Sequence, residues 1–274
     1  MSQTESTNPK SLKLDQLDSL SYVQLHIEEE QAVMQALKQA DSQIAAALDA
    51  IYKKFQLADL EQVPYQGPRL FYVGAGTSGR LGVLDASECP PTFSTEPEMV
   101  QGLIAGGDEA LRNAIEGAED DKNAGEKLIK QCIINSSDVL VGISASGGAP
   151  YVLGALEAAR EAGACTIAIA NNEDAASFAI AEHQIFLNTG PEILAGSTRL
   201  KAGTSQKICL NILSTGLMVK LGKTYGNLMV DLRATNSKLK KRAVKLVTQI
   251  INCDEAKALE LLEANDYKVK KVIK

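Results

Sequence analysis

The chain has 274 residues, of which 45% are hydrophobic and 23% are charged, as in an ordinary globular protein that needs no disulfide or structural metal to fold. Its 28 Lys and Arg against 34 Asp and Glu give a formal charge of −6. Residues 236–274 carry ten Lys and Arg against five Asp and Glu, which leaves −11 on residues 1–235 and argues against a nucleic-acid-binding core.

The N-terminal part is expected to be helical after a polar start. Residues 1–19 are polar and should be extended or loosely ordered. Residues 10–63 contain neither Gly nor Pro, and apolar residues recur in steps of three, four and seven between Leu20 and Phe55. This spacing predicts an amphipathic helical stripe, divided into two helices near Asp41 and Ser42, either of which can cap a helix.

Beyond Pro64, short apolar runs alternate with helical patterns. The runs occupy residues 69–73, 100–105, 138–143, 165–170 and 183–187. Helices are expected at 109–131 and 150–162, after Asn172, at 204–221 and, as two or three short ones, at 253–273. Five buried strands alternating with helices predict an α/β fold, a doubly wound five-stranded parallel sheet, which binds ligands beyond the carboxyl ends of its strands.

A glycine loop, GAGTSGR at residues 74–80, follows the first strand. It fits the GxGxxG pattern of dinucleotide sites, which also need an acid at the end of the second strand. That strand ends in IAGG, and Asp108 comes only afterwards. The alternatives are a glycine turn needed only for packing, or a nest in which Gly76, Thr77 and Ser78 hold a phosphate or a sugar.

A second such loop, SASGGAP at residues 144–150, follows the third strand. Ser144, Ser146 and Gly147 are expected to form a second anion nest with the start of the next helix. A flexible linker has a similar composition, but linkers do not lie between a buried strand and a helix. Strands one and three of a doubly wound sheet are neighbours, so both loops are expected to face one cleft.

Carboxylates near these loops are candidates for general acid–base chemistry. Glu88, in DASECPP at residues 85–91, is expected just beyond the helix of the first loop. Glu116 and Glu119 are spaced i, i+3 on an expected helix, where a charge cluster of this kind is more often a solvated face. Glu192 follows the fifth strand in GPEILAGSTR, residues 190–199, and Ser197 of the same segment joins it as an expected substrate-binding residue.

Metal and redox cofactors are not expected. The five cysteines lie at least 33 residues apart, which fits neither a zinc site nor a disulfide framework. His26 and His183 are far apart in the sequence and are expected to be structural. The N-terminal residues lack the apolar stretch of a signal peptide, and no apolar run approaches the roughly 20 residues of a membrane span. We therefore expect a cytoplasmic protein without a membrane partner.

Several of these segments together are specific enough to indicate a family. GAGTSGRLGVLDASECPP at residues 74–91 closely resembles the signature of the N-acetylmuramic acid 6-phosphate etherases, which carry a sugar isomerase (SIS) domain. The resemblance extends to the following segments: GLIAGG at 102–107, EGAED at 116–120, GSTRLKAGTSQK at 196–207 and GNLMVD at 226–231. It runs from about Thr4 to the C-terminus, so chance similarity is not a serious competitor.

The resemblance implies an activity, a site and an organisation. The expected reaction cleaves the lactyl ether of a phosphorylated amino sugar, N-acetylmuramate 6-phosphate, to N-acetylglucosamine 6-phosphate and D-lactate during cell-wall recycling. By the same resemblance Glu88 is the acid and Glu119 the base of a homodimer that uses no cofactor. The parts expected are an N-terminal arm with helices at 1–63, an SIS phosphosugar domain at 64–235 and a small ubiquitin-associated-like helical module at 236–274.

The chain departs from the family pattern at one place. The family usually reads AASGRTP where this chain has Ser144 and, later, Gly148-Ala149, so an Arg and a Thr that could serve a phosphate are missing. Two other functions stay open on the sequence. One is a phosphosugar aldose–ketose isomerase with Glu192 as its base, and the other is a phosphosugar sensor without turnover. Release of D-lactate would separate the etherase from both.

Overall fold

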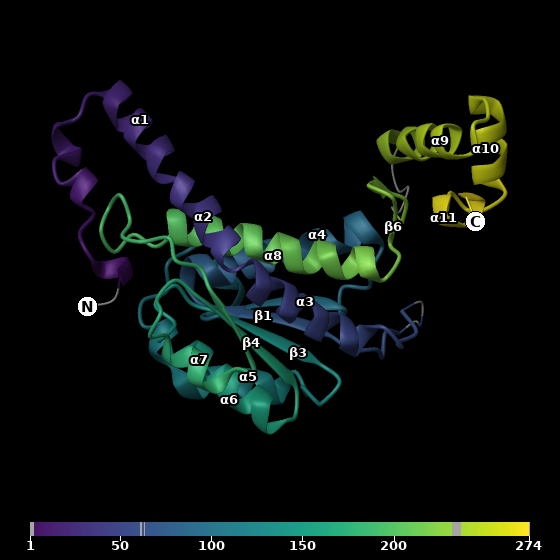
Figure 1. Cartoon of the computed structure of the whole chain (residues 1–274). Coiled ribbons are helices and arrows are strands. Elements are labelled where there is room, and N and C mark those ends of the chain that lie inside the picture. Colours follow the sequence, from purple (N-terminus) through teal and green to yellow (C-terminus); the bar gives the residue numbers. More distant parts are fainter. Residues whose placement is uncertain (1–2, 61, 63, 232–236, 274) are drawn as a thin grey trace.

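The computed structural model describes residues 3–60, 62, 64–231 and 237–273. Its centre is a parallel sheet in the order β2-β1-β3-β4-β5 (Figure 1). The strands are β1 Leu70–Gly74, β2 Val100–Ile104, β3 Val139–Ile143, β4 Cys165–Ala170 and β5 His183–Phe186. Each lies within one residue of its predicted bounds, and the predicted doubly wound α/β class is confirmed.

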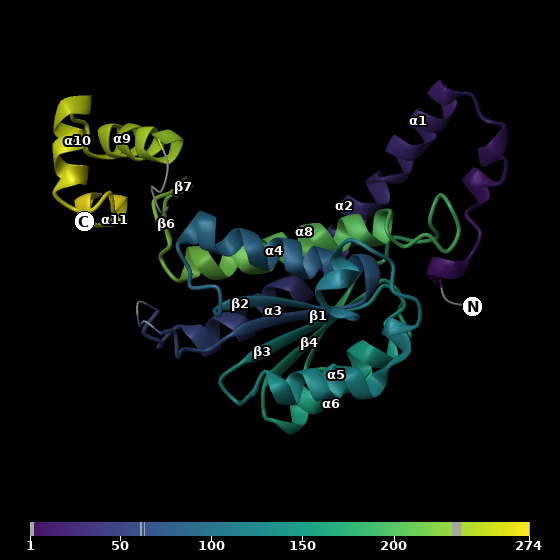
Figure 2. The ribbon, with the colours of Figure 1, turned by 180° about the vertical axis from the view of Figure 1, so that it is seen from behind.

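Helices cover both faces of the sheet (Figures 1 and 2). One face carries α3 Asp41–Phe55, α4 Gly76–Phe93 and α8 Lys201–Lys220. The other carries α5 Lys122–Gln131, α6 Pro150–Glu161 and α7 Ala176–Ile180. Alternate strand residues supply the two cores: Leu70 and Tyr72 of β1 pack toward α4 and α8, whereas Phe71 and Val73 pack toward α6. Period-two alternation in a strand buried on both faces produces this division.

The N-terminal stripe forms three helices, not the predicted two. Short 3₁₀ helices Gln3–Glu5, Pro9–Ser11 and Leu14–Gln16 precede α1 Ser19–Glu29 and α2 Gln31–Gln39. A break does occur at Ala40, but Asp41 is the first residue of α3 and makes no side-chain cap. The second half of the stripe is buried under α8, whereas Leu20 and Ile27 on α1 are 67% and 66% exposed.

The predicted helix at 109–131 is wrong for its first half. Only α5 is a regular helix there, and 3₁₀ turns at Gly107–Leu111 and Ala118–Asp120 precede it. Gly117 has φ of +72°, a left-handed conformation that interrupts helical continuity between Glu116 and Glu119. The two acids therefore do not share a helix face. The predicted end of the first loop's helix is also wrong, because α4 continues through Glu88 and two prolines to Phe93.

The C-terminal residues form a small separate core at the far end of α8 from the N-terminal arm (Figures 1 and 2). Its elements are β6 Thr224–Tyr225, β7 Leu228–Met229, α9 Ser237–Ile251, α10 Glu255–Glu263 and α11 Val269–Ile273. The predicted short helices beyond residue 253 are thus present. The domain boundaries at 63/64 and 235/236 stay predictions, since Val63, Thr235 and Asn236 lie outside the described residues.

Candidate active site

The two glycine loops lie side by side. β1 pairs with β3, with Gly74 opposite Ile143, so the loops leave the same edge of the sheet. The first loop turns tightly into α4: a Cβ at Gly79 would lie 2.6 Å from the Gly74 carbonyl oxygen, a contact that only glycine avoids. Ala75 precedes α4 and provides no side-chain cap, so the first N–H groups of α4 remain available to an anion.

A cleft of about 270 Å³ opens between these loops. It is lined by Thr4, Glu5, Ala75, Gly76, Thr77, Ser78, Glu119, Ile143, Ser144, Ala145, Ser146, Ala149, Gly196 and Thr198. Six of the ten expected site residues are among them. The four others, Gly147, Glu192, Ser197 and Glu88, do not line it. Thr4 and Glu5 were not expected there, because residues 1–19 have no pattern that marks them as structured.

The serine loop, residues 144–150, presents a hydroxyl hydrogen to the cleft. The Gly147 N–H donates to Ser144 Oγ at 3.1 Å, and the Gly148 N–H donates to Ser146 Oγ at 3.1 Å. The two Oγ atoms lie 3.3 Å apart. Each oxygen accepts a backbone N–H, and one of the two O–H groups donates to the other serine oxygen. The second O–H of the pair is left to donate, which suits a phosphate oxygen. Gly147, which is buried, thus positions Ser144 from behind the cleft.

Ser78 is fixed by a buried polar network beneath the first loop. Its hydroxyl pairs with Gln206 Oε1 at 2.8 Å, and Gln206 Nε2 donates to Asn171 Oδ1 at 2.9 Å. Asn171 Nδ2 donates in turn to Ser205 Oγ at 3.0 Å. The Ser78 O–H is therefore committed to Gln206, which leaves its backbone N–H as the group that can serve an anion at the start of α4.

Glu119 lies where the cleft meets a second cavity. That cavity, of about 210 Å³, shares Ala75, Gly76 and Glu119 with the cleft and is also lined by Arg80. The Arg80 guanidinium donates from Nε to the Leu111 carbonyl at 3.2 Å and from Nη2 to the Asn113 carbonyl at 3.0 Å. Arg80 therefore holds the segment that leads to Glu119. Among the described residues that line the two cavities, it is the one cation.

Glu88 lies far from Glu119 within one chain. It is exposed on α4, 12 residues beyond Gly76, which corresponds to about 18 Å along the helix axis. Asp85, one turn earlier, points inward instead, where Asn211 Nδ2 and Ser214 Oγ donate to its Oδ1 at 2.7 and 3.1 Å. The family resemblance grouped Glu88 and Glu119 at one site, and the structure does not bring them together in a single chain.

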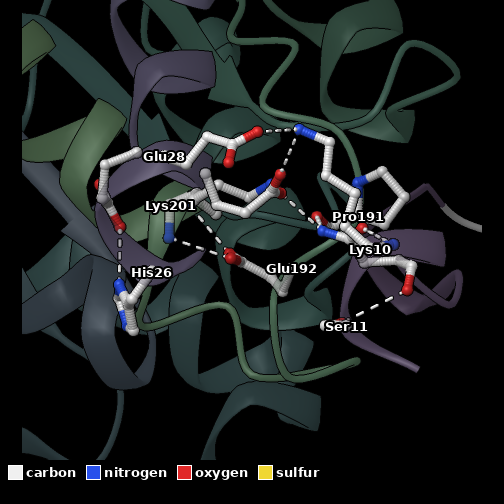
Figure 3. A network of polar contacts seen from close by, with 11 residues as sticks. Lys10, Ser11, His26, Glu28, Pro191, Glu192 and Lys201 are labelled. Atoms are coloured by element: carbon white, nitrogen blue, oxygen red, sulfur yellow. Dashed lines mark hydrogen bonds and ion pairs between the residues drawn. The ribbon is translucent and has the colours of Figure 1, made fainter. Parts of the chain in front are cut away.

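Glu192 is structural rather than accessible. It is fully buried, and its Oε2 and Oε1 accept the N–H groups of Lys201 and Ala202 at 3.0 and 2.9 Å (Figure 3). Burial raises the pKa of this carboxyl above its ordinary value, against the two N–H donors, which lower it. Glu192 therefore caps the start of α8. Ser197 lies on the loop before α8, next to the cleft residues Gly196 and Thr198.

The opposite edge of the sheet brings together one group of metal-ligand types. Ligand atoms of Cys165, Glu182 and His183 lie within 4.8 Å of one another at the starts of β4 and β5. Burial raises the pKa of the Cys165 thiol to about 11, which keeps it protonated at neutral pH and opposes metal binding. Sequence spacing could not pair these residues, and they lie away from the cleft.

Among the helices of the described residues, none combines the length and the apolar composition that a membrane span requires.

Two family models match parts of the chain. Residues 53–160 match the model of the glucokinase regulatory protein N-terminal SIS domain. Residues 226–274 match the model of the C-terminal lid domain of glucokinase regulatory protein. The second match covers the small core formed by α9, α10 and α11.

Solved structures share the fold. A phosphoheptose isomerase from Francisella tularensis superposes with a TM-score of 0.52 at 19% identity, covering 74% of this chain and all of that one. The Neisseria gonorrhoeae phosphoheptose isomerase gives a TM-score of 0.52 at 18% identity, covering 73% of this chain and 98% of the other. At such identities the likeness concerns the fold alone.

Curated relatives are much more similar. An N-acetylmuramic acid 6-phosphate etherase from Gloeobacter violaceus is 52% identical over 270 residues, which is 97% of this chain and 84% of the relative. One from Actinobacillus pleuropneumoniae serotype 7 is 48% identical, covering 98% of this chain and 86% of the relative. With identity of this level over nearly its whole length, the chain belongs to the N-acetylmuramic acid 6-phosphate etherase family.

Proposed function

We propose that this chain cleaves the D-lactyl ether of N-acetylmuramic acid 6-phosphate, giving N-acetylglucosamine 6-phosphate and D-lactate in cell-wall recycling. The observation that carries the proposal is the cleft in which two hydroxyl- and amide-rich loops lie beside Glu119, in a chain about half identical to curated etherases. The free cysteines and the sugar-phosphate substrate fit an enzyme of the reducing cytoplasm.

The shape of the site favours one orientation of the substrate. The phosphate lies against the N–H groups at the start of α4 and the hydroxyls of Ser144 and Ser146. C2 and C3 of the sugar then reach Glu119, at the junction of the two cavities. The lactyl carboxylate lies in the second cavity, where the Arg80 guanidinium can pair with it.

The chemistry requires a base and an acid. The C3–O ether is inert until the hydrogen on C2 becomes acidic, which happens when the sugar ring opens to the C1 aldehyde. The Glu119 carboxylate removes that hydrogen as a proton, and a carboxylic acid gives a proton to the departing lactate oxygen. Water then adds at C3 of the unsaturated aldehyde with the two roles reversed.

The acid is Glu88 of a second copy of the chain. Glu88 is exposed and about 18 Å along α4 from the loop of its own chain, too far to serve a sugar held there. The faces near it carry unpaired apolar side chains, with Leu84 on α4 48% exposed, and Ile212 and Val219 on α8 41% and 49% exposed. A two-fold dimer that covers these faces can bring Glu88 of each chain to the cleft of the other.

One alternative function is disfavoured by geometry. An aldose–ketose isomerase needs a base beside C2, and the sequence pointed to Glu192, whose two oxygens are buried and occupied by backbone N–H groups. The second alternative, a phosphosugar sensor without turnover, is separated from the etherase by the assay below.

Release of D-lactate from N-acetylmuramic acid 6-phosphate tests the etherase directly. Binding of the phosphosugar without release of lactate would indicate the sensor instead. A monomeric mass in solution at micromolar concentration would contradict the shared site.

A further inference from the structure

The N-terminal residues form a wall of the cleft. Thr4 is 1% exposed, and Thr4 and Glu5 line the cleft together with the two glycine loops. The polar composition of residues 1–19 predicted a loose segment, and no local pattern distinguishes these two residues. Contacts with distant parts of the chain fix them instead.

The first of these contacts ties the segment to the phosphate loops. The N–H groups of Gln3 and Thr4 donate to Asn172 Oδ1 at 2.7 and 3.3 Å. Asn172 Nδ2 donates to Thr4 Oγ1 at 3.1 Å and to the Ala145 carbonyl, between the two loop serines, at 2.9 Å. The Gly196 N–H donates to the Thr4 carbonyl at 3.3 Å. Asn172 thus links the N-terminal segment to the serine loop by hydrogen bonds to both.

The second contact is a buried ion pair at the start of α8 (Figure 3). Lys201 Nζ lies 2.8 Å from Glu29 Oε2 on α1, and both side chains are almost fully buried. Asn8 Nδ2 donates to the same oxygen at 2.6 Å, and Lys10 Nζ lies 3.1 Å from Glu29 Oε1. Because an unpaired buried charge is costly, this cluster keeps residues 8–10 against α1 and α8.

Between these two anchors, the exposed Glu5 side chain lines the cleft without a protein donor. No hydrogen bond or ion pair to its carboxylate occurs among the described residues. Its Oε2 lies beside Gly196, where an added Cβ would be 3.1 Å away, and the positive φ of +78° at Gly196 separately favours glycine there. An ionised carboxylate only accepts hydrogen bonds and repels a phosphate, so a ligand group that contacts Glu5 has to be an O–H or N–H donor.

We infer that Glu5 is a further substrate-binding residue, which accepts a hydrogen bond from a hydroxyl or the acetamido N–H of the sugar. The inference rests on the proposed function, because it assumes a phosphorylated amino sugar in the cleft. It assigns the phosphate end of the ligand to the glycine loops and the sugar ring to the N-terminal wall.

Calorimetric titration of Glu5→Gln and Glu5→Ala with N-acetylglucosamine 6-phosphate and, separately, with inorganic phosphate tests the assignment. Loss of a hydrogen bond to a charged group should weaken sugar phosphate binding about 10- to 100-fold and leave phosphate binding unchanged. KM for the etherase substrate should rise more than kcat falls. Glu161→Gln, an exposed acid at the far end of α6, is the matched control and should bind like wild type.

Two results would overturn the inference. One is unchanged affinity of both Glu5 variants for N-acetylglucosamine 6-phosphate, with thermal unfolding like that of wild type. The other is tighter binding of inorganic phosphate, which would place the carboxylate beside the phosphate. If wild-type protein binds the sugar phosphate but releases no D-lactate, the proposed activity fails while the binding comparison still decides the role of Glu5.

Discussion

Restoring the missing cation at Gly148 should strengthen substrate binding. No Lys or Arg is among the described residues that line the cleft, although its ligand carries a phosphate. A Cβ at Gly148 would meet only Ser146 Oγ at 3.9 Å, and Gly148 is not in the left-handed region, so the backbone there accepts a side chain without strain. The N–H group that supports Ser146 is retained in Gly148→Arg.

The size of the effect follows from two opposing contributions. A hydrogen bond to a charged group contributes about 1.5–3 kcal/mol, and ordering an arginine side chain costs up to about 2 kcal/mol. A net gain of about 1 kcal/mol corresponds to a KM roughly fivefold lower, with kcat little changed, because a phosphate contact is the same in ground and transition states.

Initial rates of D-lactate release at several substrate concentrations measure this effect. The gain should shrink as ionic strength rises, since salt screens an exposed guanidinium. Ala162→Arg adds the same charge at the opposite end of α6 and should leave KM unchanged. A KM in Gly148→Arg that is equal to or above the wild-type value, in a protein that unfolds at the same temperature, would refute the placement of the phosphate at the serine loop.

Three further predictions concern the loop, the two glutamates and acid stability. Ser146→Ala should raise KM more than it lowers kcat, and an unchanged KM would count against its contact with phosphate. In deuterated water, Glu88→Gln should still exchange the C2 hydrogen while lactate release falls about 10²–10⁴-fold, whereas Glu119→Gln should lose both; the reverse pattern would exchange the roles. Burial opposes ionisation of Glu29, but hydrogen bonds from Lys201, Lys10 and Asn8 hold the pKa of Glu29 below the ordinary value of 4.5. The stability that ionised Glu29 contributes should therefore be lost as pH falls below about 4.5. Glu29→Gln should flatten that part of the unfolding curve against pH, and an unaltered curve would contradict the assignment.

The sheet and the paired loops could be predicted because they depend on local patterns. Short apolar runs that end in glycine or small polar residues marked every strand, and the neighbouring positions of β1 and β3 followed from the doubly wound topology. The helix at 109–131 was overextended because Gly117 adopts positive φ within an otherwise helical composition. Periodicity alone does not reveal that conformation.

The rest of the site depends on contacts between distant residues. Glu192 looked like a base because it follows a strand, yet backbone N–H groups nine and ten residues later occupy it. Thr4 and Glu5 reach the cleft through Asn172, 168 residues from Thr4 in the sequence. The family resemblance pairs Glu88 with Glu119, but Glu88 lies 12 residues along α4 from the loop that Glu119 adjoins, so the two are far apart within one chain. Sequence patterns predicted the residue types of the site but could not show how far apart the fold places them.

Mixing two inactive variants tests the shared site most directly. Glu88→Gln and Glu119→Gln, purified separately, are combined in equal amounts under conditions that allow subunits to exchange, and D-lactate release is measured. If Glu88 acts in the cleft of the other copy, each mixed dimer holds one intact site. Random pairing should then restore about a quarter of the wild-type rate, because half the dimers are mixed and half their sites are intact. If subunit exchange is verified and the mixture stays as inactive as the two variants alone, Glu88 does not act across the dimer.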